Sequence, residues 1–362
     1  MPTCQVDQHH FGSPPSSKSA ARSGKRSGGE GRTSIVAGWD IVDVMLPACS
    51  TVDRPRPRPY APAVADLPSP AGRSAFRPRP PDQRSIVELI RDGTLDAELT
   101  AQLWLLIEAR VPIVVAAEAG GVGKSTVLRA LLDFLPATTR VVELAGEGET
   151  FDWLPQASEL GWPGVARATA GGEPVRAETT VLFAAELSDH LPIYTWAAAA
   201  RVAIRAASIG YGLASTIHAD SLEDVFEALR QPPVRLVDDE LSHLGVVLVV
   251  RRLDDDRRRV VAAHFVRPVA RDQHGHLQRL GPAVLATWDE TTDTFEHFGW
   301  GVTPELALRT GHRAGDFEIE VDRRREYVER LVAAGVTEPV PARTAIRDYR
   351  PAAVFDASGS DA

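Results

Sequence analysis

Residues 116–126, AAEAGGVGKST, bring together the side chains that a phosphate-binding loop needs. The apolar run PIVVAA predicts a buried strand before the loop, and STVLRALLDFL predicts a helix after it. Glycines let backbone N–H groups close around an anion, a lysine reaches the terminal phosphates, and a Ser or Thr hydroxyl holds magnesium. The residues that we predict to bind a nucleotide are Gly120, Gly121, Val122, Gly123, Lys124, Ser125 and Thr126.

The residue types around this loop argue in two directions. Lys124 is the only lysine after Lys25, and arginine supplies the other positive charges, which suits a role for one compact charge on phosphate. The usual spacing, however, places a glycine at position 118, where this chain has Glu118. A glycine-rich strand-to-helix turn that binds no ligand therefore remains the alternative for this stretch.

A second apolar run, VLFAAE, ends in an acid at Glu186. Ligands of open α/β sheets bind at the carboxyl ends of the parallel strands, so we expect Glu186 beside the loop. A carboxylate there can orient or deprotonate a water directed at the γ-phosphate, and with Ser125 it can hold a magnesium ion. A solvated acid at a strand end is the alternative.

Two further residues are expected at the same edge. His218 ends the run GLASTIH, with a predicted helix between it and Glu186, although a lone histidine at a strand end is often structural. In RVVELAGEGE, Glu143, and less readily Glu147 or Glu149, can hold magnesium through water, and a solvated acidic turn is the alternative. The candidate catalytic residues are therefore Glu186, His218 and Glu143.

Composition narrows the class of protein. The chain of 362 residues has a net charge of −9, and positive charge gathers in residues 1–82, so the acidic remainder is not expected to bind nucleic acid. The longest apolar runs are too short to cross a bilayer, and no export signal is recognisable. Cys4 and Cys49 can form neither a metal knuckle nor a disulfide framework. We expect a cytoplasmic protein.

Short apolar strands alternate with helices through the middle of the chain, which predicts an α/β fold with a mainly parallel sheet flanked by helices. Apolar runs joined by short turns after Leu241 predict antiparallel strands added C-terminally, followed by two helices. The predicted strands are 112–117, 140–145, 180–186 and 212–218, and the predicted helices are 125–135, 196–207, 221–230, 304–310 and 318–334.

The segments GVGKST, VVELAGEGE, VLFAAELSD and GYGLASTIHADS, in this order, resemble the type II/type IV secretion and pilus-assembly ATPase family. The stretch SIVELIRDGTLDAELTAQLWLLIEARVPIVVAA also resembles the helical lead-in that the family places before its phosphate loop. The resemblance covers residues 84–266 and implies a RecA-like P-loop NTPase core that binds ATP and Mg²⁺. It departs from the family at Glu118 and at Ser188, where the family usually has arginine.

The resemblance also implies roles for single residues and a mode of action. Lys124 and Ser125 would hold phosphate and magnesium, Glu143 would match the acidic box, Glu186 the Walker B acid, and His218 the His box that senses nucleotide state. The family forms homo-hexameric rings that turn ATP hydrolysis into motion against a membrane platform protein. The chain would then work in the cytoplasm, peripherally at the inner face of the cell membrane.

These observations divide the chain into a disordered head at 1–82, a helical lead-in at 83–110, a P-loop ATPase core at 111–270, C-terminal strands and helices at 271–340, and a flexible tail at 341–362. Two alternatives stay open. One is a nucleotide-binding regulator of the same fold with little turnover, which Glu118 and the lack of a recognisable N-terminal domain favour. The other is a partitioning-type P-loop ATPase, although Ala119 stands where those enzymes have a lysine.

Overall fold

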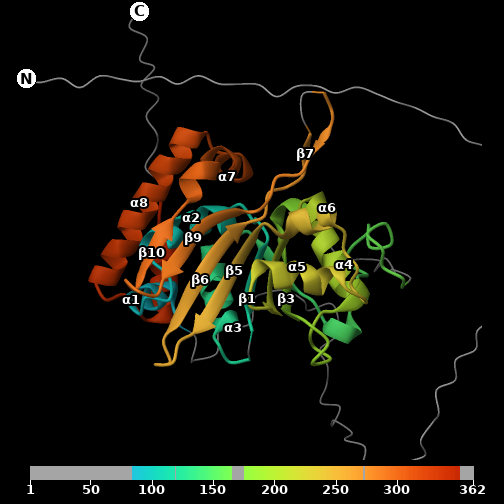
Figure 1. Cartoon of the computed structure of the whole chain (residues 1–362), viewed down its shortest axis with the longest axis horizontal. Coiled ribbons are helices and arrows are strands. Elements are labelled where there is room, and N and C mark those ends of the chain that lie inside the picture. Colours follow the sequence, from blue (N-terminus) through green and yellow to red (C-terminus); the bar gives the residue numbers. More distant parts are fainter. Residues whose placement is uncertain (1–83, 119, 165–174, 272–273, 351–362) are drawn as a thin grey trace, which may run out of the picture. The chain divides into compact units, whose positions relative to one another are not determined.

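The computed structural model describes residues 84–118, 120–164, 175–271 and 274–350. The predicted head at 1–82, with Cys4 and Cys49, and the end of the predicted tail at 351–362 lie outside these residues. Within them, the chain folds around one eight-stranded sheet in the order β10-β9-β6-β5-β1-β4-β3-β2 (Figure 1).

The sheet has a parallel half and an antiparallel half. Strands β5, β1, β4, β3 and β2 are parallel, and β6, β9 and β10 continue the sheet with antiparallel pairing. The predicted α/β class, with a parallel core and antiparallel strands added C-terminally, is confirmed. The strands of this sheet are β1 Ile113–Ala117, β2 Arg140–Glu143, β3 Thr180–Leu187, β4 Gly212–His218, β5 Val246–Arg252, β6 Arg258–Phe265, β9 Ala283–Asp289 and β10 Thr294–His297, and a separate hairpin pairs β7 Ala270–Arg271 with β8 Leu277–Gln278.

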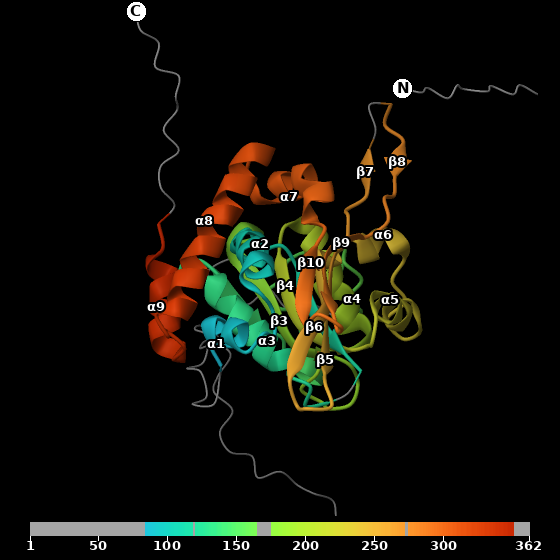
Figure 2. The ribbon, with the colours of Figure 1, turned by 60° about the vertical axis from the view of Figure 1, so that its left-hand side comes forward.

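Helices cover both faces of the sheet, as Figure 2 shows. Successive side chains of a strand point to opposite faces, and every residue of the central strand β1 is buried. Ile113, Val115 and Ala117 join the core cluster that includes the first three helices, whereas Val114 and Ala116 join the cluster on the other face. The helices are α1 Ile86–Arg91, α2 Ala97–Glu108, α3 Lys124–Leu131, α4 Ala197–Ala206, α5 Leu222–Arg230, α6 Asp238–Leu241, α7 Thr303–Thr310, α8 Ala314–Ala333 and α9 Pro339–Asp348.

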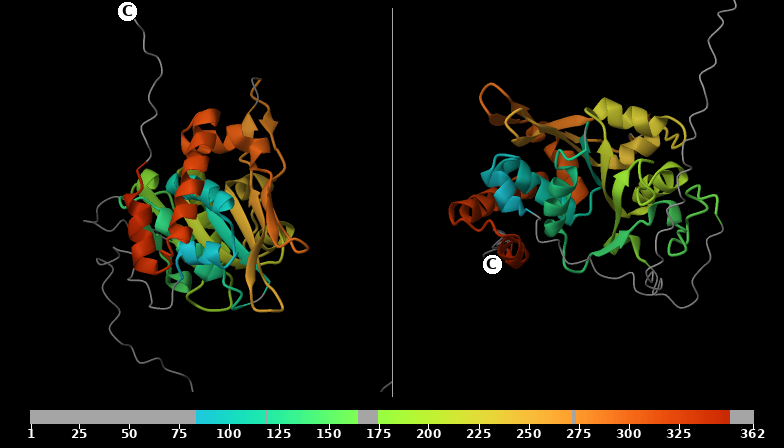
Figure 3. Two further views of the ribbon diagram at one scale, coloured as in Figure 1. Left: turned by 90° about the vertical axis from the view of Figure 1, so that its left-hand side faces the viewer. Right: turned by 90° about the horizontal axis from the view of Figure 1, so that it is seen from below.

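The predicted helical lead-in is the pair α1 and α2, which packs against the C-terminal helices α8 and α9 (Figure 3). Because α9 is a helix, the prediction of a flexible tail is wrong for residues 341–348. Only Ala342 and Ile346, one helical turn apart, are buried on α9, so the apolar periodicity that would reveal it is weak. No helix in the described ranges is both long and apolar enough to cross a membrane.

Candidate functional site

The predicted phosphate-binding loop runs from the end of β1 to the start of α3. Gly121 has φ +77° and Gly123 has φ +113°, left-handed conformations that glycine adopts without strain. A side chain at position 123 would also collide with Arg258, whose Cδ lies 2.9 Å from the place of a Cβ atom. Helix α3 begins at Lys124, so its first backbone N–H groups face the loop, as an anion site requires. Ala119 lies outside the described residues.

Lys124 is 6% exposed and contacts Glu186 and His218. Its Nζ lies 3.7 Å from Glu186 Oε2 and 3.4 Å from His218 Nδ1. Burial lowers the pKa of Lys124, and the charge and hydrogen bond of the Glu186 carboxylate oppose this shift. A buried ammonium facing one carboxylate can exchange that carboxylate for the phosphates of a nucleotide.

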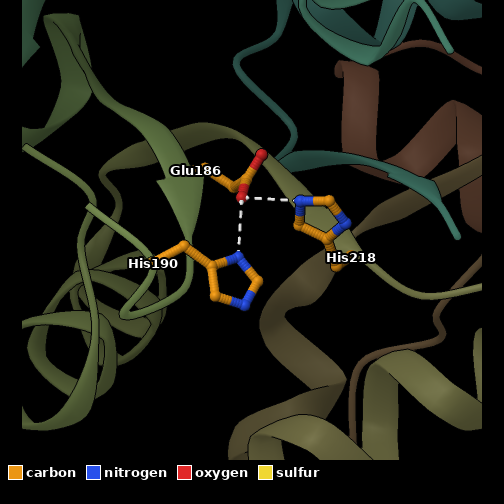
Figure 4. A group of neighbouring side chains, drawn as sticks. All are labelled: Glu186, His190 and His218. Carbon is orange, nitrogen blue, oxygen red and sulfur yellow. Dashed lines mark ion pairs between the residues drawn. The ribbon is translucent and has the colours of Figure 1, made fainter. Parts of the chain in front are cut away.

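Glu186 lies near the end of β3, where the pairing with β4 is irregular between Ala184 and Leu187. Its Oε1 accepts a hydrogen bond from Ser188 Oγ at 3.0 Å. Figure 4 shows the same oxygen between two imidazoles, 3.0 Å from His218 Nε2 and 3.9 Å from His190 Nδ1. Among the described residues, the polar contacts of this buried carboxylate are with an ammonium group, a hydroxyl group and two imidazole rings.

His218 ends β4 and pairs in register with Ala117, the last residue of β1. Its Nδ1 lies 3.2 Å from the backbone oxygen of Glu118. The residue that replaces the expected glycine therefore holds His218 through its main chain, while its own side chain is exposed. Parallel pairing of β4 with β1 on one side and with β3 on the other thus brings Lys124, Glu186 and His218 together, as the sequence predicts.

Three further predicted site residues lie on α3 and on β2. Ser125 is exposed and Thr126 half-buried in the first turn of α3. Glu143 is exposed at the end of β2, which is an edge strand of the sheet. Strands β3 and β4 lie between β2 and β1, so β2 is about 14 Å from β1 at the usual strand spacing. In the described part of the chain no hydrogen bond or ion pair joins it to Lys124 or Glu186, and its catalytic role stays a prediction.

Glu149, a lesser candidate from the same acidic turn, has a structural role. It is 3% exposed and accepts hydrogen bonds from the backbone N–H groups of Ala145, Thr150 and Phe151 and from Trp153 Nε1. Its oxygens are occupied by these donors, so it fixes the loop after β2.

The structure places three residues at the site that the sequence does not identify as site residues, one of them being Ser188, which stands out in the sequence only as a departure from the family. Ser188 and His190 follow Glu186 on the turn after β3, and their closeness in sequence to the predicted acid is the signal that could have revealed them. Arg258 comes from the β5–β6 hairpin, and its Nε donates a 2.8 Å hydrogen bond to the Val122 oxygen in the loop. Nothing in the spacing of the sequence connects Arg258 with a loop 136 residues earlier.

Comparisons with known proteins give distant similarities. The structure is similar to the X-ray structure of the ATPase DotB of Legionella pneumophila, with 15% identity, 66% of this chain and 62% of that chain covered, and a TM-score of 0.27. For the ATPase DotB of Yersinia pseudotuberculosis the identity is 14%, the coverage 71% and 62%, and the TM-score 0.28. The matched region is thus less than two thirds of either solved chain.

In sequence, the chain is similar to two uncharacterised proteins of Methanocaldococcus jannaschii. One is 28% identical over 253 residues, which are 67% of this chain and 90% of that protein. The other is 24% identical over 262 residues, 69% of this chain and 46% of that protein. No protein-family model matches the chain.

Proposed function

We propose that this chain binds ATP and hydrolyses it with Mg²⁺, as a motor of the secretion and pilus-assembly type. The observation that carries the proposal is the convergence of Lys124, Glu186 and His218 at the carboxyl ends of β1, β3 and β4, directly beside a glycine-bent loop that leads into a helix. Phosphoryl transfer to water requires a loop that binds phosphate, a lysine that neutralises its charge and an acid that positions the water. Lys124 supplies the lysine, and Glu186, near the end of β3, supplies the acid.

In this proposal each residue has a separate task. The Lys124 ammonium binds the β- and γ-phosphates, and the N-terminal end of α3 supplies backbone N–H groups to the same oxygens. Ser125 and Glu186 offer the oxygen ligands that Mg²⁺ prefers, and the bound ion would neutralise charge that develops on the phosphates. Glu186 orients the attacking water and accepts its proton, while His218, whose Nε2 lies 3.0 Å from Glu186 Oε1, transmits the presence of the γ-phosphate to β4.

The same arrangement gives the regulator alternative its physical basis. Lys124 and Glu186 contact each other, so nucleotide binding has to separate them before either can act. If the ion pair between Lys124 and Glu186 were more stable than the contacts that replace it, the chain would bind ATP slowly or bind it without turnover. The hexameric ring, the membrane platform partner and a place at the inner face of the membrane are further parts of the proposal, and they rest on the sequence resemblance.

Phosphate release by the full chain with Mg²⁺-ATP, in low and high salt, tests the proposal. We expect Glu186→Gln to lower turnover by about 100-fold or more, because it removes the base, while ATP still binds. Glu178→Gln is the matched control, since Glu178 is exposed at the opposite end of β3. Equal turnover in wild type and Glu186→Gln would contradict the assignment of Glu186, and tight binding without turnover in wild type would favour the regulator.

A further inference from the structure

The side chains around Glu186 Oε1 form a candidate metal-binding set that includes His190, a residue to which the proposed ATPase reaction gives no role. Glu186, His190 and His218 each offer one ligand atom, and these three atoms lie within 4.8 Å of one another (Figure 4). The two imidazoles are close enough to contact, with ring centroids 5.1 Å apart. Zinc and related ions bind in proteins to two histidines and one carboxylate, and a water molecule completes the coordination.

The distances around Glu186 Oε1 suit a small ion. Zinc binds nitrogen and oxygen at about 2.0–2.2 Å, which places the ligand atoms of a tetrahedral site about 3.4 Å apart. The observed separations, 3.0 Å to His218 Nε2 and 3.9 Å to His190 Nδ1, lie on either side of this value. The His190 side chain is 60% exposed on the turn after β3, so it can make the small approach that remains.

One of the two neutral tautomers of His218 suits ligation through Nε2. Its Nδ1 faces the Glu118 backbone oxygen at 3.2 Å and Lys124 Nζ at 3.4 Å, and its Nε2 faces Glu186 Oε1 at 3.0 Å. In one tautomer Nδ1 accepts from Lys124 and Nε2 donates to Glu186, and in the other Nδ1 donates to the Glu118 oxygen and the Nε2 lone pair faces Oε1. A cation between Nε2 and Oε1 selects the second tautomer. A ligating histidine that donates its other N–H to a backbone carbonyl is the usual arrangement of metal sites.

The groups behind the ligands point the same way. Ser188 Oγ donates to Glu186 Oε1 at 3.0 Å, which orients the carboxylate. Lys124 Nζ, the nearby positive charge, lies 3.7 Å from the other oxygen, Oε2, and 3.4 Å from Nδ1 of His218, the ring nitrogen that is not the proposed ligand. Nitrogen donors favour zinc, cobalt or nickel, whereas Mg²⁺ takes oxygen ligands, so this set differs in chemistry from the magnesium position assigned to Ser125 and Glu186.

We propose that Glu186, His190 and His218 bind a transition-metal ion of the zinc type, and that the bound ion holds Glu186 away from the attacking water and so slows ATP turnover. The first half stands on the ligand geometry alone, and the second half rests on the proposed function. The ion would make the enzyme responsive to the concentration of available zinc.

Binding of Co²⁺ to the full chain without nucleotide tests the site independently of any ATPase activity. We expect the visible absorption of low-coordinate Co²⁺, displaced by Zn²⁺, and at least about 100-fold weaker binding in His190→Ala. His190→Cys restores a ligand and is expected to recover binding with an added thiolate-to-cobalt absorption band. Equal Co²⁺ affinity in wild type and His190→Ala would overturn the site. His312→Ala, which removes a histidine between α7 and α8, controls for the other histidines of the chain.

Inhibition of ATP turnover by Zn²⁺ tests the second half. We expect Zn²⁺ at micromolar levels and excess Mg²⁺ to slow wild-type turnover at least about tenfold, and the ratio of rates with and without Zn²⁺ to return towards one in His190→Ala. The same ratio in both proteins would overturn the regulatory role while leaving the Co²⁺ result intact. A chain that binds Co²⁺ at this site but hydrolyses no ATP would contradict the proposed function and not the metal site.

Discussion

The helical side of the molecule and the loop both bury charged side chains, and they do so in different ways. On the helical side, Arg324 is 3% exposed and its guanidinium lies 2.6 Å from Glu108 and 3.0 Å from Glu320. The same guanidinium stacks over the Trp104 ring at 4.8 Å. At the loop, Lys124 is similarly buried but lies 3.7 Å from Glu186, whose other contacts are a hydroxyl and two imidazoles.

This difference separates a structural cluster from a site. Arg324 is surrounded by close partners of opposite charge and by aromatic rings, so a ligand could only weaken these contacts. Tyr349, in the same cluster, has its pKa raised to about 12 by burial and by the charge of Glu320, which keeps the phenol neutral. The groups at the loop face one another at longer distances and lie at the carboxyl ends of the parallel strands. Phosphate can therefore replace the Glu186 carboxylate beside Lys124, and a metal ion can replace Lys124 beside Glu186.

The largest effect on stability is expected from Arg324→Ala. The variant removes the nearest opposite charge from the buried Glu320 carboxylate, which keeps the Tyr349 hydroxyl at 3.1 Å and the Arg323 guanidinium at 3.8 Å. It also removes the guanidinium that stacks on Trp104, and we expect a total cost of about 3 kcal/mol of unfolding free energy. Urea unfolding measures this loss, and ATP affinity of the folded variant should not change. Arg325→Ala is the matched control, because its exposed pairs with Asp322 and Glu329 are worth less than about 1 kcal/mol. Equal costs for the two variants would remove the distinction between the two regions.

A smaller effect, confined to the loop, is expected from Arg258→Ala. Its hydrogen bond to Val122 fixes the loop backbone, and losing a bond from a charged donor costs about 1.5 kcal/mol, or roughly tenfold in ATP affinity. Titration with a fluorescent ATP analogue measures it. The neighbouring Arg257 pairs instead with Asp255 on the same hairpin and with Asp293 on the turn between β9 and β10, so Arg257→Ala should leave the affinity as it is. A tenfold loss in both variants would mean that the whole hairpin, and not Arg258, supports the loop.

The smallest effect is a pH dependence that arises away from both regions. Burial lowers the pKa of His297, but its hydrogen bond to Asp96 and the charges of Asp96 and Glu98 outweigh this, so the pKa is raised. A raised pKa stabilises the fold fully below about pH 6.5, the usual histidine value, and this stability is lost as pH rises through the folded-state pKa.

For this partly exposed pair we expect a loss on the order of 0.5–1 kcal/mol, measured by urea unfolding from pH 5.5 to 8.5. Asp96→Asn should flatten the profile while preserving the cap of α2, since asparagine also caps helices. A profile that keeps its slope in this variant would assign the pH dependence to another group.

The sequence predicts the centre of the site better than its surroundings. Lys124, Glu186 and His218 follow short apolar strands, and parallel pairing brings the ends of such strands to one edge whatever the loops do. His190 and Ser188 lie on a turn without periodicity, whose conformation depends on the irregular pairing of β3 with β4. Arg258 reaches the loop from the antiparallel half of the sheet, so its contact follows from the order of strands, which local patterns do not encode.

The fold shows the same division. Strands and helices of the parallel half have strong apolar patterns, which predict their bounds to within a few residues. Helix α9 has two buried positions, and its sequence predicts a flexible tail instead. The catalytic role of Glu143 remains a prediction, because Glu143 lies at the end of an edge strand. A water molecule or a conformational change would be needed to connect its carboxylate with the loop.

The central claim is that Lys124 binds the phosphates of a nucleotide, and the most direct measurement is the ATP affinity of the full chain beside those of Lys124→Ala and Lys124→Arg. We expect Lys124→Ala to weaken binding by about 100-fold or more, equivalent to about 2.7 kcal/mol, and Lys124→Arg to weaken it too, since a guanidinium does not replace a compact charge in this buried position. Equal ATP affinity in wild type and Lys124→Ala would contradict the account, because the loop would then be a glycine-rich turn without a ligand.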